Sequence, residues 1–147
     1  MKKVLSCILL FSLFFLTGCT KTTKEEYLKI YNNEENFITL TGEITQCEYK
    51  NFEDSNRLNY TVIVYVKSGE LEKYIGTNSD SQEFWVFSDL HLNLAIGDKI
   101  TFTLCKKNPK GTAWLPIVEI IKEEKTLLDY KAGKENLLAW VDQLQYK

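Results

Sequence analysis

Histidine and arginine each occur only once in this 147-residue chain, as His91 and Arg57. Triad hydrolases depend on a positioned histidine, and sites that stabilise a phosphoryl transition state depend on cationic groups such as arginine. His91 stands between Leu90 and Leu92, where a solvent-facing or cap-proximal histidine is the simpler interpretation. Clustered metal ligands and a glycine-rich phosphate loop are also missing. We therefore expect no metal, no cofactor and no enzymatic activity.

A long apolar run is missing as well. Lys2 and Lys3 are followed by an apolar stretch from Val4 to Leu16, which is 13 residues long. A membrane-spanning helix needs about 20 apolar residues, so this stretch is too short to span a bilayer. A short positive region followed by such a stretch is typical of a signal peptide.

The apolar stretch ends in the residues LTGC, from Leu16 to Cys19. This ending resembles the lipobox of bacterial lipoproteins. The resemblance implies a signal peptide of residues 1–18, cleavage between Gly18 and Cys19, and a diacylglycerol on the Cys19 thiol. It also implies a further acyl chain, such as palmitate, on the new amino terminus. The alternatives are a secreted protein with an accidental cysteine and an uncleaved anchor.

Lipidation would place the domain in the bacterial cell envelope, outside the cytoplasm, because two acyl chains give stable anchoring to a bilayer. Both the cell membrane and an outer membrane stay open, since Thr20 is not the aspartate associated with inner-membrane retention. Removal of the signal peptide, which holds Lys2 and Lys3 and no acid, would change the net charge from −2 to −4. An acidic chain with one arginine argues against a nucleic-acid partner.

Apolar and polar residues alternate from Phe37 onward, which is the period of a β-strand. Five segments carry the pattern: FITLTGEITQC, LNYTVIVYV, EFWVFS, DKITFTLC and AWLPIVEII. Pro116 in the last segment predicts a bulge or an edge position. We expect five strands.

The segment SDLHLNLAIGDKI lies between the third and fourth strands, with a possible helix cap at Ser88 or Asp89 and a turn at Gly97 and Asp98. A helix between strands three and four of a five-stranded antiparallel barrel resembles the layout of the OB-fold. The resemblance covers residues 37–123 and rests on pattern and order. Gly42 suits the bend of a long first strand. Another five-stranded barrel or a small sandwich is the alternative.

The ends of the mature chain have different patterns. Residues 19–36 form a polar segment, for which we expect a lipidated tether with a short helix near Glu25 to Tyr31. Residues 124–147 repeat apolar side chains at helical spacing, which predicts an amphipathic helix that packs on the barrel. Its stripe comprises Leu137, Trp140, Val141 and Leu144.

Two cysteines, Cys47 and Cys105, remain apart from the proposed anchor. Both fall on the threonine-rich faces of their strands. In an OB-like barrel the fourth strand pairs with the start of the first, which places Cys105 near Phe37 or Ile38. Cys47 would then lie roughly 25–30 Å away, too far for a disulfide. We expect both thiols to be free.

OB-folds bind ligands on the face of strands two and three and on the loops that join strands one to two and four to five. The candidate ligand-binding residues there are Tyr65, Trp85, Lys106, Lys107, Lys110 and Trp114. The first of these loops adds Tyr49, Lys50, Phe52 and Arg57. In the third strand, the outward pair is either Trp85 and Phe87 or Phe84 and Val86. Alternatively, the C-terminal helix covers Tyr65 and Trp85, and the lysines form a solvated turn.

The sequence therefore predicts a lipid-anchored envelope protein whose OB-like domain binds a protein or an envelope ligand without catalysis. Aromatic rings beside cations are also typical of modules that bind single-stranded nucleic acids, so an oligonucleotide- or oligosaccharide-binding module is the first alternative. The three lysines could equally meet anionic lipid headgroups. A hydrolase that uses His91 is the last alternative.

Overall fold

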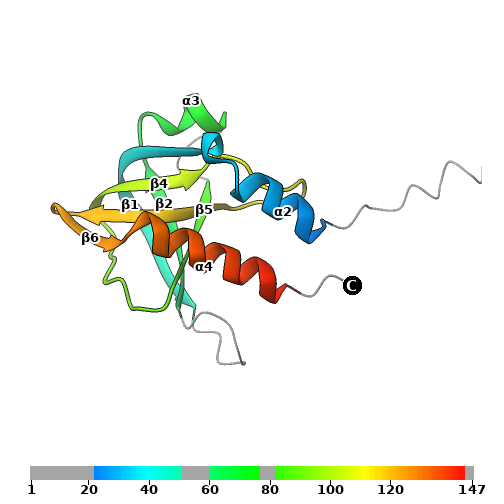
Figure 1. Ribbon diagram of the computed structural model, residues 1–147. Helices are drawn as coiled ribbons and strands as arrows, with labels where there is room; N and C mark the ends of the chain where they lie inside the picture. The colour runs from blue at the N-terminus through cyan, green and yellow to red at the C-terminus, as the bar shows by residue number, and fades with distance from the viewer. Residues whose placement is uncertain (1–21, 51–59, 77–81, 145–147) are drawn as a thin grey trace, which may run out of the picture.

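A computed structural model describes residues 22–50, 60–76 and 82–144. The predicted signal peptide and Cys19 lie outside these residues. The described chain forms a closed five-stranded β-barrel with one additional strand, a short helix between the second and third strands and a C-terminal helix (Figure 1). The mainly β, OB-like barrel expected from the sequence is confirmed.

The strands follow one another around the barrel in an order that differs from their order in the chain. They are β1 (Phe37–Lys50), β2 (Tyr60–Lys67), β3 (Glu83–Ser88), β4 (Lys99–Cys105), β5 (Leu115–Lys122) and β6 (Lys125–Leu128). The order in the sheet is β3-β2-β1-β4-β5-β6, with a further pairing of β3 with β5 that closes the barrel. The closing pair is parallel, so the sheet is mixed and not wholly antiparallel.

Strand β1 belongs to both halves of the barrel. Its first half pairs with β4 and its second half with β2, and Gly42 lies next to the changeover at Glu43. A Cβ atom on Gly42 would come within 2.5 Å of Cγ1 of Val66, so the close approach of β2 requires glycine here. The expectation that the first strand serves both halves of the barrel is confirmed.

A register shift between Ile44 and Gln46 then changes which residues face inward. Leu40 and Ile44 belong to the core inside the barrel, and after the shift Cys47 and Tyr49 pack against that core. The sequence alternation had placed Cys47 on the opposite, threonine-rich face. That assignment was wrong because the bulge inserts one residue and reverses the alternation.

The middle strands follow the predicted alternation. The interior core, meaning the apolar cluster enclosed by the strands, is filled mainly by aliphatic residues of alternate positions. Phe84 and Val86 of β3 point into it, so Trp85 and Phe87 are the outward pair. From β4 the inward residues are Ile100, Phe102 and Leu104, as expected.

The helix predicted between strands three and four is absent from residues 89–98, all of which the structure describes. Leu92 and Leu94 of this loop are buried in the interior core, whereas Leu90 is 71% exposed. A helix would have needed Leu90 on the buried side. The loop instead alternates buried and exposed residues, and Asn93 has a left-handed backbone with φ 51°. The short helix of the barrel, α3 (Leu71–Ile75), lies between β2 and β3.

Strand β6 was not predicted. It forms a hairpin with β5 through Glu123 and Glu124, whose φ angles are 50° and 65°. A two-residue turn with both φ angles positive is type I′, which sequences usually mark with Asn-Gly. This chain has two glutamates in the turn, so its sequence did not predict the hairpin. The register of β5 against β4 skips Val118, two residues after Pro116, in agreement with the expected bulge.

Two helices and a single turn of 3-10 helix cover one outer side of the barrel (Figure 1). α2 (Lys24–Tyr31) starts in a capping box between Thr23 and Glu26, and the turn η2 (Glu34–Asn36) leads into β1. α4 (Tyr130–Gln143) starts at the cap residue Asp129 and packs on β5 and β3. The predicted stripe of α4 faces the barrel: Leu137 and Val141 are fully buried, and Trp140 and Leu144 pack beside them.

Helix α4 touches the barrel most closely at Gly133. A Cβ atom there would lie 1.7 Å from the carbonyl oxygen of Val118, so the helix backbone rests directly on β5. The helix runs through Gly133, and the glycine permits the contact.

Candidate functional site

The predicted aromatic face exists, and helix α4 covers part of it. Trp85 and Trp114 stack with ring centres 4.7 Å apart and planes 13° apart. Trp140 of α4 stacks on Phe87 at 5.1 Å and meets Trp114 edge-on at 5.1 Å. These rings belong to the outer layer, which we define as the apolar cluster between α2, α4 and the barrel. The helix thus packs on Phe87 and Trp114, whereas Trp85 and Trp114 stay partly exposed and Tyr65 lies outside this cluster.

The polar atoms of this face are used within the chain. The Tyr65 hydroxyl donates a hydrogen bond to a Glu83 carboxylate oxygen at 3.1 Å, and Nε1 of Trp85 donates to the other oxygen. Partial burial and this bond to Glu83 raise the pKa of Tyr65 above its ordinary value. Tyr65 and Trp85 are thus brought together through Glu83, in an arrangement that stabilises the fold.

The predicted lysines lie elsewhere. Lys107 and Lys110 line a pocket of 380 Å³ between α2 and the loop from β4 to β5. We call it the lysine pocket; its lining is Glu26, Lys29, Ile30, Asn33, Asn36, Lys107, Asn108, Pro109 and Lys110. Lys106 is half-buried outside this lining, and its backbone N–H donates to the Asn36 carbonyl at 2.8 Å. Trp114 is not in the lining either, although Asn108 of the lining donates to its carbonyl, so the lysines and the tryptophan rings do not line one common pocket.

A second pocket, of 440 Å³, lies at the opposite end of the barrel. We call it the rim pocket; its lining is Thr41, Gly42, Glu43, Lys67, Ser68, Gly69, Lys99, Ile100, Thr101, Ile121, Glu123 and Glu124. Lys99 begins β4 in the rim pocket, and Cys105 ends β4 next to the lysine pocket. Seven residues of strand separate the two pockets by roughly 20 Å.

Sequence reasoning missed the rim pocket because its residues come from the ends of several strands. The one available signal was Gly42, which the sequence marked only as a bend. Of the loop predicted between strands one and two, Phe52 and Arg57 lie outside the described residues. Gly42 belongs to this lining, and the neighbouring strand is so close to it that a Cβ atom there would collide with Val66.

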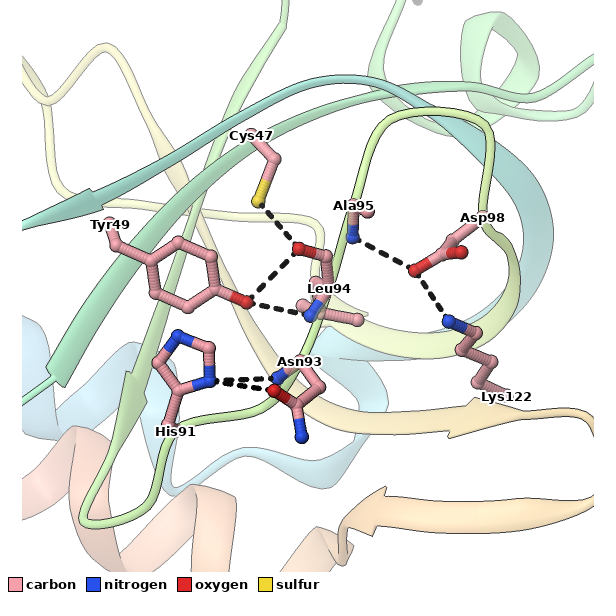
Figure 2. A network of polar contacts seen from close by, with 8 residues as sticks. All are labelled: Cys47, Tyr49, His91, Asn93, Leu94, Ala95, Asp98 and Lys122. Atoms are coloured by element: carbon pink, nitrogen blue, oxygen red, sulfur yellow. Dashed lines mark hydrogen bonds and ion pairs between the residues drawn. The ribbon is translucent and has the colours of Figure 1, made fainter.

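The single histidine belongs to a network that fixes the loop between β3 and β4 (Figure 2). The His91 ring stacks on Tyr49 with centres 4.4 Å apart, and the backbone N–H of Asn93 donates to its Nδ1 at 3.3 Å. The Tyr49 hydroxyl donates to the Leu94 carbonyl at 3.1 Å and accepts from the Leu94 N–H at 2.6 Å. The Cys47 thiol donates to the same carbonyl at 3.6 Å.

The electrostatics of this network disfavour nucleophilic chemistry. Burial raises the pKa of the Cys47 thiol, and the Asp98 carboxylate raises it further. A reactive cysteine needs a lowered pKa, because the thiolate is the nucleophile. Asp98 itself accepts hydrogen bonds from the Ala95 N–H at 2.9 Å and from Lys122 at 2.8 Å, as Figure 2 shows. The network therefore holds the loop in place.

Cys105 is fully buried in the outer layer, and its thiol donates to the Lys107 carbonyl at 3.2 Å. Burial raises the pKa of this thiol to about 11. Cys105 pairs with Phe37 across β1 and β4, which is the register expected from the sequence. Cys47 pairs with Val64 on the other half of β1, and both thiols are free in the structure.

Comparisons with known proteins provide no relative for this chain. No protein-family model matches it, and no curated protein or solved structure shows significant similarity. Within the described residues, no three His, Cys, Asp or Glu side chains are grouped so that they could hold a metal ion. None of the helices there is long and apolar enough to cross a bilayer.

Proposed function

We propose that this chain is a lipid-anchored bacterial envelope protein whose OB-like barrel binds a protein or another envelope ligand without catalysis. The anchor rests on the LTGC motif, and Cys19 stands only five residues before Lys24, the first residue of α2. The folded domain therefore starts close to the proposed lipid, and the tether that the sequence suggested is short.

The observation that carries the binding role is the position of the rim pocket. The lysine pocket lies beside the start of α2 and hence beside the proposed anchor, whereas the rim pocket is at the other end of β4. A partner approaching from the aqueous side would meet the rim pocket first. Its lining offers acids, two lysines and hydroxyl groups, which suits a polar segment of a protein or a polar envelope molecule.

The alternatives receive less support. A module for oligonucleotides or oligosaccharides would use the stacked Trp85 and Trp114, which are only partly exposed because they pack against Phe87 and Trp140. A hydrolase would use His91, whose ring is stacked on Tyr49 and accepts from Asn93. These contacts favour a positioning role for His91 over a role as a general base.

The proposed lipid anchor is tested by the intact mass of the protein. The protein is extracted in mild detergent from its native membrane, and its mass is measured before and after thiol alkylation under denaturing conditions. We expect a chain that starts at Cys19, carries added acyl mass and gains two alkyl groups. An unlipidated chain would remove the anchor, and a chain without free thiols would contradict the register around Cys47 and Cys105.

The binding role is tested with a photo-crosslinking side chain placed in turn at Thr41 and at Lys99, both of which are exposed and line the rim pocket. The matched control is Glu72, which is exposed on α3 outside the pocket. We expect a defined adduct in intact cells from the pocket positions and none from Glu72. Equal adducts from all three positions would contradict a site at the rim.

A further inference from the structure

The lysine pocket has a local charge opposite to that of the chain. Three lysines, Lys29, Lys107 and Lys110, line it against a single acid, Glu26. All three lysine side chains are exposed, so their ammonium groups can reach a partner in front of the pocket. The mature chain would carry a net charge of −4, so the charge of the lysine pocket is opposite in sign to that of the whole molecule.

The walls of the pocket are fixed by hydrogen bonds. The Asn108 side chain accepts from the Tyr31 hydroxyl and donates to the Trp114 carbonyl, which joins the loop to α2 and to β5. The Asn36 side chain donates to the Ile30 carbonyl at 2.9 Å. Glu26 is part of the helix cap, since its carboxylate accepts from the Thr23 N–H at 2.9 Å. The lysines thus extend from a rigid frame.

The pocket is also next to the proposed anchor. The Thr22 hydroxyl donates to the Lys110 carbonyl at 3.4 Å, so the chain enters the domain at this loop. Cys19 precedes Thr22 by three residues, which span at most about 11 Å whatever their conformation. At this distance Lys110 is within reach of the headgroups around a lipid attached to Cys19. The acids Glu43, Glu123 and Glu124 are at the opposite end of the barrel.

We propose that the lysine pocket binds the anionic headgroups of the bilayer that carries the anchor, and so fixes which end of the barrel faces the membrane. This inference rests on the proposed lipidation of Cys19. The recognised chemistry is a phosphate anion, and the source is the lipid surface, because the anchor holds the pocket there. The same orientation directs the acidic rim pocket away from the negative surface.

The test uses the mature, lipidated protein in nanodiscs of phosphatidylcholine alone or with added phosphatidylglycerol. The rate at which each lysine is acetylated is measured by mass spectrometry. We expect Lys107 and Lys110 to react roughly fivefold more slowly in the anionic discs, from the attraction of a single lysine to such a surface. Lys67 and Lys99 at the rim should react equally in both discs. High salt should abolish the protection by screening.

Paired variants identify the residues responsible. In anionic discs, K107A/K110A should restore the acetylation rate of Lys29 to its value in neutral discs, whereas the matched K67A/K99A should leave Lys29 protected. Circular dichroism checks that both variants are folded, which we expect because all four side chains are exposed.

Three results would overturn the inference, and they are distinguishable. If acyl mass is present on Cys19 but all lysines react equally in both discs, the anchor stands and the headgroup contact is wrong. If free glycerol phosphate protects Lys107 and Lys110 equally well in neutral discs, the pocket recognises a soluble anion and not the bilayer. If no acyl mass is found, the proposed anchor and the inference fail together.

Discussion

The interior core and the outer layer of this protein are built in different ways. The interior core is enclosed by hydrogen-bonded strands and consists mostly of aliphatic side chains, with Phe84 and Phe102 in edge contact. The outer layer holds all three tryptophans of the chain together with Tyr27 and Tyr31. The barrel encloses the first cluster by itself, whereas the second exists only when α2 and α4 lie on the barrel.

Side-chain contacts and aromatic packing together hold the helices in place. The Asn136 side chain donates to the Phe87 carbonyl at 3.0 Å, and Lys24 of α2 pairs with Asp142 of α4 at 2.5 Å. The Tyr31 hydroxyl donates to Asn108, and Glu34 accepts from Lys134 and Tyr130 of α4. The close contact at Gly133 completes the attachment. Since local units of a fold can open separately, we expect the outer layer to open without unfolding of the barrel. Cys105, buried in that layer, is a native probe of such opening.

The largest effect is expected from Phe102→Ala in the interior core. The ring is fully buried, and its removal should lower the free energy of unfolding by about 3–5 kcal/mol, from lost burial and the cavity left behind. Chemical denaturation measures this loss. The matched variant is Phe87→Ala, which removes the same ring from the outer layer.

The two variants should differ in how fast the Cys105 thiol is alkylated under native conditions. Phe102→Ala should accelerate alkylation only as far as global unfolding becomes more frequent. Phe87→Ala should accelerate it beyond that, because the helices separate first. If alkylation follows global unfolding in both variants, the two clusters form one cooperative unit, and the outer layer does not open separately from the barrel.

A smaller effect is expected from Gly133→Ala, which disturbs the contact between helix α4 and strand β5. The new methyl group cannot fit against the Val118 carbonyl, so α4 must move outward, at a cost of about 1–3 kcal/mol. Thermal unfolding measures the loss, and Cys105 should become more reactive. Glu135→Ala, on the exposed side of the same helix, is the control and should change stability by no more than about 0.5 kcal/mol. An unchanged melting temperature for Gly133→Ala would show that the helix does not need this contact.

The smallest effect is expected from Asp98→Asn, which affects the loop that supplies Leu92 and Leu94 to the interior core. The bond from Lys122, supported by the Ala95 N–H, lowers the pKa of the Asp98 carboxyl, whose side chain is only 16% exposed. The folded state therefore favours the charged form. This stabilisation is present above the ordinary carboxyl pKa of about 4 and is lost as the pH falls through the lower folded pKa.

Asp98→Asn should thus lower stability by about 1 kcal/mol at neutral pH and make stability less dependent on pH in the acid range. Denaturation at a series of pH values measures both effects. Glu34 also has a lowered pKa, because it accepts from Lys134 and Tyr130, but it is exposed, and Glu34→Gln should have a weaker effect. Cys105 alkylation that rises in Asp98→Asn by more than global unfolding does would count against the separation of the two regions.

The sequence predicted the interior core well because strand alternation reports directly which residues face inward. Val62, Val64 and Val66 in β2 and the inward residues of β4 follow from period two alone. The errors occur where a single residue changes the backbone. The bulge between Ile44 and Gln46 reversed the assignment of Cys47, and the left-handed Asn93 is part of a loop where a helix was expected.

The candidate sites were predictable only in part. Aromatic and basic residues identified Trp85, Trp114, Lys107 and Lys110, but composition could not show that Trp140 of α4 packs against Trp114. The lysines form a pocket only because α2 lies beside their loop, and the rim pocket combines strand ends that are far apart in sequence. Such combinations depend on tertiary packing and leave no local pattern.

Helix α4 follows the barrel strands in the chain, and this order affects how the protein folds. Closing the barrel joins distant segments, as in the contact between Thr39 and Thr103, which are 64 residues apart, so folding must wait for most of the chain. Synthesis proceeds from the N-terminus, and α4 follows all six described strands in the chain. Until α4 emerges, Phe87, Trp85 and Trp114 face water on a nearly finished barrel. The 14-residue helix α4 therefore protects the protein from aggregation. A chain truncated before it would expose an aromatic, aggregation-prone surface.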